Sequence, residues 1–366
     1  MKRSKLLLGI GASLCVIALF GSCGKKAAKS VDLNSVSLDK IISEAKKEGR
    51  VESVGMPDAW ANWGETWAGI KSKYGIEHAD LDMSSAEEIS MFEAEANAPT
   101  KDIGDIGAAM CATAMEKGVT QAYKTSQWEK IPAWAKDPDG NWVIGYYGTI
   151  SFLTNTKLVK NPPKSWQDVL KGDYKLTIGD VVKASQAQAT VASAALAFGG
   201  SLDNIQPGID FFKKLGEQGR LDKGDLSLAR IQKGEIAVAV QWDYNSLGDR
   251  AQAIAADPTM SFVANIPVDG ALQLGYATII NKHAPHPYAA ALAREYILSD
   301  EGQINLAKGF ASPIRSDVAI PADIQAKLID RAEYGKAQPI TDFAVWAKSI
   351  TELSQKWQDD VVPVMK

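Results

Sequence analysis

Short apolar strands alternate with amphipathic helices along this sequence, and no other feature constrains the fold as strongly. Residues 51–55 are predicted to form a buried strand, and three tryptophans then recur at helical spacing from Trp60. Residues 76–82 alternate as a second strand, and a further strand and helix follow at 102–117. A βαβα order of this kind predicts a mainly parallel sheet with helices on both faces, which is the α/β class.

A second set of alternating elements begins after Tyr147. Strands are predicted at 175–178, 236–242 and 274–280, with helices between them. A length of 366 residues is typical of two domains, or of one large domain with two lobes. The sequence therefore predicts two α/β units in one chain.

The first 22 residues predict that the protein is exported. Lys2, Arg3 and Lys5 precede an uncharged stretch at 6–20. That stretch is shorter than the roughly 20 apolar residues that a helix needs to cross a bilayer. A basic start followed by a short apolar run is typical of a secretory signal peptide, which we assign to 1–22.

The small residues before Cys23 resemble a bacterial lipoprotein processing site. That resemblance implies that Cys23 becomes the mature N-terminus and carries fatty acyl chains such as palmitate. Residues 23–36 would then form a lipidated tether that anchors the protein to a bacterial membrane, on the periplasmic or the cell-surface side. An ordinary secreted protein with a chance cysteine at this position is the alternative.

The charge balance argues against a protein that binds nucleic acid. The chain has 40 Lys+Arg against 44 Asp+Glu, a formal net charge of -4, and its signal peptide holds basic residues without acidic ones. The mature body is therefore more acidic than the whole chain. Nucleic-acid binders instead rely on basic residues that neutralise phosphates, so we expect no nucleic-acid partner.

No catalytic motif stands out in the sequence. The nucleophile elbow, the Walker A loop, the dinucleotide-binding glycine motif and the paired-cysteine motif are absent. His283 and His286 are separated by Pro285, which favours an irregular turn over a pair of metal ligands. Cys111 lies in a predicted helix among small apolar residues, so core packing is favoured over a nucleophilic role. We therefore expect a protein without enzyme activity, cofactor or metal.

Three segments resemble one protein family. Residues 284–287 (Ala-Pro-His-Pro) open an alanine-rich helix that is followed by Ser-Asp-Glu-Gly-Gln at 299–303. Residues 161–170 hold Asn-Pro-Pro-Lys-Ser-Trp, and Lys-Gly-Glu at 233–235 precedes the strand into Trp-Asp-Tyr at 242–244. In this order the segments are similar to those of family 1 extracellular solute-binding proteins of ABC importers.

The resemblance implies a type 2 periplasmic binding protein, in which two α/β lobes close on a ligand. Each lobe would have a mainly parallel sheet flanked by helices, and two crossover strands, at 148–154 and 274–280, would join them. Lobe one would comprise 37–150 and 278–366, and lobe two 151–277. The implied function is to bind a small solute as a monomer and to deliver it to the permease and ATPase subunits of an importer.

Candidate ligand contacts lie in the loops at the carboxyl ends of the predicted strands, where ligands bind in open α/β sheets. Some of these residues have a structural alternative. Ser84 with Glu87 three residues later is a capping-box signature, and Asp180 also precedes a helix. Trp242 and Tyr244 lie two apart, on one face if the strand extends that far. The candidates are Asp58, Trp60, Ser84, Ser85, Asp180, Gln186, Trp242, Asp243, Tyr244 and Tyr276.

The candidate loops favour an organic cation of the polyamine type. They are acidic and aromatic, so Trp242 and Tyr244 could pack on the cation while Asp180 or Asp243 opposes its charge. Two ligand classes of the same family stay open. Ferric binders place adjacent tyrosines where this chain has one, and binders of phosphonates or sugar phosphates need basic residues, of which the loops hold Lys183, or bare helix N-termini. A surface adhesin or antigen and an exported enzyme are the rival functions of other classes.

Overall fold

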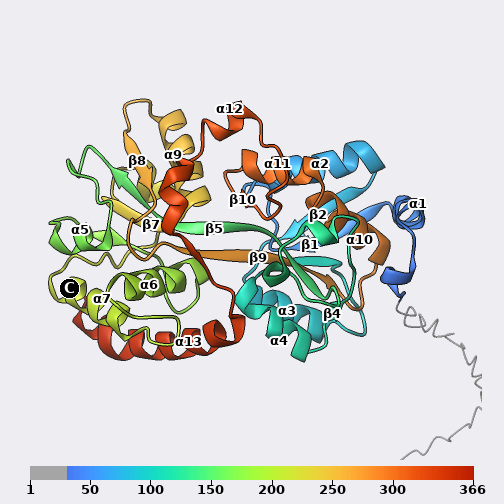
Figure 1. Cartoon of the computed structure of the whole chain (residues 1–366), viewed down its shortest axis with the longest axis horizontal. Coiled ribbons are helices and arrows are strands. Elements are labelled where there is room, and N and C mark those ends of the chain that lie inside the picture. The colour runs from blue at the N-terminus through green and yellow to red at the C-terminus, as the bar shows by residue number, and fades with distance from the viewer. Residues whose placement is uncertain (1–30) are drawn as a thin grey trace, which may run out of the picture.

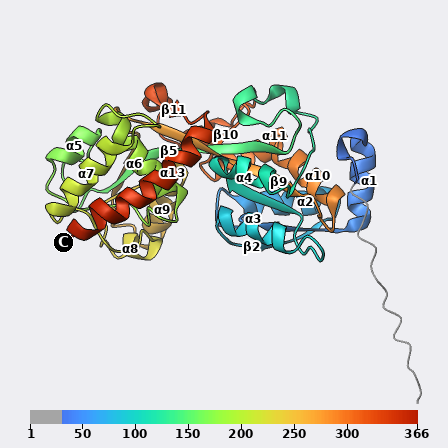
Figure 2. The ribbon, with the colours of Figure 1, turned by 90° about the horizontal axis from the view of Figure 1, so that it is seen from below.

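The computed structural model describes residues 31–366 and shows two lobes of helices packed on strands (Figures 1 and 2). The predicted signal peptide at 1–22 and the predicted lipidation site Cys23 lie outside the described residues. Within 31–366, no helix is both long enough and apolar enough to cross a bilayer.

The described end of the predicted tether at 23–36 is part of the first lobe. Leu33 is fully buried, and the Gln121 side chain donates a hydrogen bond to the Val31 carbonyl at 2.6 Å. A tether with little apolar content was expected here. The burial of one leucine instead docks this segment on the folded domain.

Lobe one begins with three parallel strands in the spatial order β2-β1-β3. A helix follows each strand, as the alternation predicted, and Gly49 and Gly75 end the first two helices in the left-handed conformation. Trp63 and Trp67 are buried in the core, as their helical spacing indicated. The elements are α1 (Leu38–Glu48), β1 (Arg50–Val54), α2 (Trp63–Tyr74), β2 (Glu77–Leu81), α3 (Ser85–Ala94), β3 (Ile103–Gly107), α4 (Cys111–Glu116) and β4 (Thr120–Gln121).

Two long antiparallel strands, β5 (Trp142–Asn155) and β9 (Leu272–Asn281), connect the lobes. The predicted crossings at 148–154 and 274–280 lie within them. β9 pairs with β3 in lobe one, and β5 pairs with β7 in lobe two, so the strand order is β2-β1-β3-β9-β5-β7-β6. Because both crossing strands run antiparallel to their neighbours in this order, the sheet is mixed rather than mainly parallel.

In lobe two β6 pairs in parallel with β7, whereas β5 pairs antiparallel with β7 and with β8. Trp166 is fully buried here, and its indole N–H donates to Ser193 Oγ at 3.0 Å. The strands are β6 (Leu176–Thr177), β7 (Val238–Trp242) and β8 (Phe262–Asn265). The helices are α5 (Trp166–Lys171), α6 (Ser185–Ala197), α7 (Gln206–Glu217), α8 (Leu228–Gln232) and α9 (Asp243–Ala256).

After β9 the chain returns to lobe one and then spans both lobes. The last helix packs its first residue, Phe343, on Trp142 at 5.7 Å between ring centroids, whereas Trp357 beyond its end packs on Phe212 of lobe two at 5.5 Å. The assignment of all of 278–366 to lobe one is therefore wrong for this segment. The elements are α10 (Pro287–Ile297), α11 (Asp300–Lys308), β10 (Ser312–Pro313), α12 (Ala322–Gln325), β11 (Gln338–Pro339) and α13 (Phe343–Lys356).

Candidate functional site

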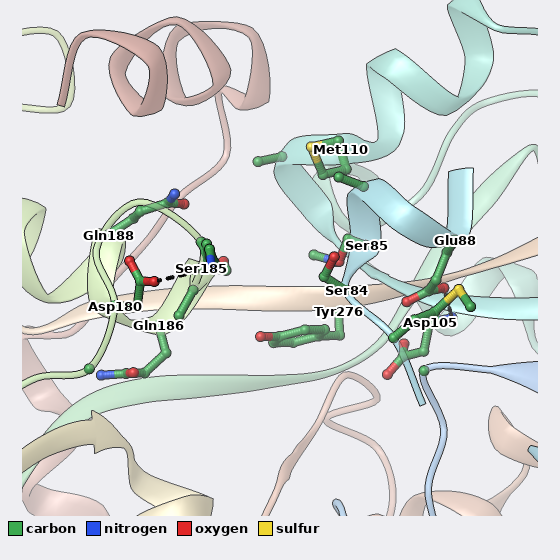
Figure 3. Close-up of a pocket in the computed structure, with 18 of the residues that line it drawn as sticks. Ser84, Ser85, Glu88, Asp105, Met110, Asp180, Ser185, Gln186, Gln188 and Tyr276 are labelled. Carbon is green, nitrogen blue, oxygen red and sulfur yellow. Dashed lines mark hydrogen bonds and ion pairs between the residues drawn. The ribbon is translucent and has the colours of Figure 1, made fainter. Parts of the chain in front are cut away.

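A cavity of about 730 Å³ lies between the two lobes (Figure 3). Its walls come from the segments that follow β2 and β3 in lobe one and β6 and β7 in lobe two, with Tyr276 of β9 between them. The carboxyl ends of strands in open α/β sheets are where ligands bind, and the sequence predicted this location.

Two serines face the cavity at the start of α3, because the chain turns into this helix soon after β2. Glu87 Oε2 accepts hydrogen bonds from the Ser84 N–H at 2.9 Å and from the Ser84 hydroxyl at 2.6 Å, so the predicted capping pair forms. Ser85 Oγ accepts from the Gly107 N–H at 3.0 Å. Ser84 therefore both caps the helix and lines the cavity.

The N-terminus of α6 faces the cavity from lobe two. Its N-cap residue, Ala184, has no side-chain acceptor, so no cap forms on the first-turn N–H groups. A Cβ placed on Gly107 would lie 3.6 Å from Ser185 Oγ and 3.9 Å from Ser85 Oγ. The Ser85 and Ser185 hydroxyl groups, one from each lobe, therefore both lie near the Cα of Gly107, where the absence of a side chain leaves room.

Gln186 and Asp180 complete the wall from lobe two, opposite Ser84 and Ser85 in Figure 3. The Gln186 amide donates to the Ile178 carbonyl at 3.3 Å, which fixes this side chain at the end of β6. Lys183 Nζ lies 3.9 Å from Asp180 Oδ2, and both side chains are more than half exposed. An ion pair this exposed contributes little to stability, so Lys183 is available to the cavity.

Two buried carboxyl groups, Glu88 and Asp105, form the deep wall of the cavity in lobe one. Glu88 Oε2 accepts a hydrogen bond from the Asp105 N–H at 3.1 Å. Burial raises the pKa of Asp105 to about 8. Burial, and the nearby Asp105, raise the pKa of Glu88 well above its ordinary value.

Aromatic side chains from both lobes and both crossing strands pack beside this carboxyl pair. The Trp60 indole N–H donates to Tyr146 Oη at 3.0 Å, and the Tyr146 hydroxyl donates to Asp105 Oδ2 at 2.7 Å. The Trp60 ring lies 5.8 Å from the Tyr276 ring and 6.0 Å from the Tyr244 ring. Trp60 therefore contacts lobe two while it reaches the buried carboxylate of lobe one through Tyr146.

Metal binding and thiol chemistry find little support in this part of the molecule. Among residues 31–366, no group of three His, Cys, Asp or Glu side chains is placed to hold a metal ion. Cys111 is 1% exposed, and burial raises the pKa of its thiol well above the ordinary value. A buried thiol with a raised pKa packs as a small apolar side chain rather than reacting.

A family model described as "Bacterial extracellular solute-binding protein" matches residues 98–347, more than half of the chain. The chain belongs to this family. The predicted resemblance is thereby confirmed, and with it the coarse function of an extracellular solute-binding protein. Lipid anchoring at Cys23 stays a prediction.

A relative from Salmonella typhimurium, provisionally named as a 2-aminoethylphosphonate-binding periplasmic protein, is 26% identical to this solute-binding protein over 210 residues. The match covers 51% of this chain and 55% of the relative, so the chain spans about half the length of the curated relatives it matches. Relatives of the same name occur in Salmonella paratyphi A and Salmonella typhi.

Solved structures of two binding proteins share the fold. AfuA of Actinobacillus pleuropneumoniae, with fructose-6-phosphate bound, has a TM-score of 0.65 at 19% identity, covering 85% of this chain and 98% of AfuA. Iron-bound HitA of Pseudomonas aeruginosa has a TM-score of 0.67 at 16% identity, covering 84% and 98%. The predicted type 2 periplasmic binding fold of this solute-binding protein is confirmed.

Six of the ten residues that the sequence proposed as ligand contacts line the cavity, and four do not. Asp58 is exposed in the turn before α2, and Tyr244 is buried. Trp242 is fully buried, with its indole N–H 3.4 Å from Tyr276 Oη. Asp243 accepts from the Thr149 N–H at 3.0 Å and the Tyr334 hydroxyl at 2.7 Å, which occupy its carboxylate. The six that line the cavity are Trp60, Ser84, Ser85, Asp180, Gln186 and Tyr276.

The candidates proposed from the sequence omit several polar residues that line the cavity, among them Glu88, Asp105 and Ser185. Asp105 lies near the end of β3 and Ser185 begins α6, both within segments that the strand pattern predicts as loops at strand ends, so their position was a usable signal. Glu88 lies in the first turn of a charged helix and looks like a solvent-facing residue. Its burial depends on contacts with other strands, which the local sequence does not report.

Proposed function

We propose that this protein captures a small solute bearing a phosphonate, phosphate or carboxylate group and delivers it to an ABC importer. The observation that carries the proposal is the convergence of Ser85 and Ser185, one from each lobe, at the side-chain-free surface of Gly107. The N-termini of α3 and α6 stand behind these two hydroxyls.

This arrangement suits an anion for electrostatic reasons. A helix N-terminus carries a partial positive charge and unpaired N–H donors, and serine hydroxyls add donors that can rotate toward an oxygen. The α6 terminus has no side-chain cap of its own, so its donors are free for a ligand. Hydrogen bonds to a charged group contribute about 1.5–3 kcal/mol each, enough for a few of them to hold a small solute.

The other ligand classes fit this cavity less well. The polyamine prediction relied on Trp242 and Asp243, which do not line the cavity, and it stays unconfirmed. Ferric iron would need tyrosinate ligands, but Tyr146 and Tyr244 are buried behind the cavity and Tyr276 is the tyrosine that lines it among residues 31–366. The Salmonella relatives are named for a phosphonate and AfuA holds a sugar phosphate, which supports an anionic group.

Calorimetric titration of the wild-type protein and two serine variants tests the proposal. We expect Ser185→Ala to weaken binding of 2-aminoethylphosphonate about tenfold, equivalent to roughly 1.4 kcal/mol, because one donor from lobe two is lost. Ser90→Ala is the matched control, since the Ser90 hydroxyl is exposed on α3 and bonds to the Ala86 carbonyl. Binding of spermidine or ferric citrate, with no binding of phosphonates, phosphates or carboxylates, would show that the proposal is wrong.

We also propose that the protein is anchored through Cys23, as the processing-site resemblance implies. The thiol is the group that lipoprotein processing acylates, so Cys23→Ser should abolish incorporation of labelled palmitate and move the protein out of the detergent phase. Undiminished labelling of the variant would contradict the anchor at this position.

A further inference from the structure

The carboxyl pair of Glu88 and Asp105 has no cationic partner in the described part of the chain. None of the ion pairs within residues 31–366 includes either group, although Glu88 is 1% exposed and Asp105 is 4% exposed. Buried carboxyl groups are normally paired with a cation or hydrogen-bonded at every oxygen, because desolvation of an unpaired charge is costly. This pair is an exception at the wall of the cavity.

Two glycines shape the chain around the Glu88 carboxyl group. A Cβ at Gly55 would lie 2.3 Å from Glu88 Oε1, and a Cβ at Gly104 would lie 2.7 Å from Glu88 Oε2. Both distances are below any normal contact, so only glycine at these positions lets the carboxyl group occupy this place. The Glu88 side chain is thereby held beside Asp105.

One oxygen of Asp105 is left without a donor. Asp105 Oδ2 accepts from the Tyr146 hydroxyl, whereas Asp105 Oδ1 is buried and has no hydrogen-bond partner. Buried acceptors are nearly always paired, and Asp105 lines the cavity. A donor supplied by a ligand would pair this oxygen.

Aromatic rings flank the same place. Trp60 and Tyr276 both line the cavity, with their ring centroids 5.8 Å apart, and Trp60 is linked to Asp105 through Tyr146. A cation close to such ring faces gains an electrostatic attraction that grows when water is excluded. The carboxyl oxygens and the aromatic rings therefore favour the same kind of ligand group, a small one that carries both positive charge and N–H donors.

We propose that Asp105 and Glu88 form a subsite for a protonated primary amine, so that the solute is a zwitterion with its amine at Asp105 and its anionic group at Ser85 and Ser185. This inference rests on the anionic subsite proposed above. It also accounts for the excess of carboxyl groups in the cavity, whose lining includes Asp82, Asp180 and Asp225 besides the buried pair but Lys183 as its one basic residue among residues 31–366. A simple anion would meet that excess as repulsion.

Capture of the amine should release a proton. The groups that act on the pair are acids, phenols and a thiol, and none of them is basic: Asp80 and Asp82 on the β2 side, Cys111 on α4, Tyr146 on β5, Tyr244 on α9 and Tyr276 on β9. Burial raises the pKa of Asp105 to about 8, so near pH 7 the pair of the free protein holds a proton. The ammonium ion takes the place of that proton, which passes to the buffer. The net charge of the occupied subsite is therefore the same as that of the free one.

Titration of wild-type protein with 2-aminoethylphosphonate and with ethylphosphonate, which lacks the amine, tests the subsite. We expect the amine-bearing compound to bind at least tenfold more tightly. In two buffers of different ionisation enthalpy at pH 7, its binding to the wild type should release close to one proton more than its binding to Asp105→Asn, which lacks the titrating carboxyl group. This comparison uses one compound, so the ionisation of its phosphonate cancels. Equal affinity with equal proton release would overturn the amine subsite and leave the anion subsite standing.

Variants of the carboxyl pair test whether the amine binds at this place in the cavity. Asp105→Asn should weaken binding of the amine compound at least tenfold and leave ethylphosphonate within twofold, and Glu88→Gln provides a second variant should the first fail to fold. Asp323→Asn, which removes an exposed carboxyl group of α12 outside the cavity, should change neither affinity more than twofold. Amine binding that survives in both Asp105→Asn and Glu88→Gln would overturn the inference. If neither phosphonate binds the wild type, a phosphate and a carboxylate are titrated in the same way, each with and without an amine. Binding of none of these compounds would overturn both the proposed function and the amine subsite.

Discussion

At the scale of single residues, the buried carboxyl groups of the cavity affect how stability depends on pH. The pKa of an aspartate in an unfolded chain is near 4, whereas burial raises that of Asp105 to about 8. Between these values the folded state binds a proton that the unfolded state has lost. The contribution of Asp105 to stability is therefore fully present below about pH 4 and declines as pH rises toward 8, by up to about 1.4 kcal/mol per pH unit.

Asp105→Asn should flatten this pH dependence in the absence of ligand. Asparagine cannot ionise, so we expect the variant to be more stable than the wild type at pH 8, and the difference to shrink at pH 5. Urea unfolding at the two pH values measures the effect, and Asp225→Asn is the control that removes a cavity carboxyl group from lobe two. Parallel changes of stability with pH in Asp105→Asn and the wild type would contradict the expectation.

At the scale of elements, the strands and helices around the cavity were largely predictable because their signals are local. The capping pair of Ser84 and Glu87 located the start of α3, and the end of a predicted strand located the loop that holds Trp60. The junction between β7 and α9 was not predictable in the same way. The strand ends at Trp242 and the helix begins at the next residue, so the alternation of side chains that the sequence suggested does not continue.

The burial of Asp243 and Glu88 depends on residues far away in the chain. Tyr334, 91 positions after Asp243, donates to its carboxylate, and Gly55 and Gly104 make room for Glu88 from two other strands. The helix α13 is a similar case, because an amphipathic pattern indicates a helix but does not tell which lobe its apolar side will meet. A sequence pattern shows at which spacing side chains are buried, whereas tertiary structure determines which residues they pack against.

At the scale of the whole molecule, β5 and β9 are the connections about which the lobes can move, and α13 adds contacts to both lobes. The cavity residues are divided between the lobes, with Ser85 on one and Ser185 on the other. A ligand that binds both serines interacts fully only with the closed form. It should therefore shift the population from open to closed, since a ligand favours the state that it binds more tightly.

Small-angle scattering should accordingly show a smaller radius of gyration when 2-aminoethylphosphonate is bound. Trp60 reports the same change independently, because its ring lies 6.0 Å from Tyr244 of lobe two and opening would separate them. We expect a ligand-dependent change in tryptophan fluorescence that is lost in Trp60→Phe, with Trp166→Phe in the core of lobe two as the control that keeps it. With binding verified by calorimetry, an unchanged radius together with unchanged Trp60 fluorescence would contradict closure, because any movement of the lobes must alter one or the other.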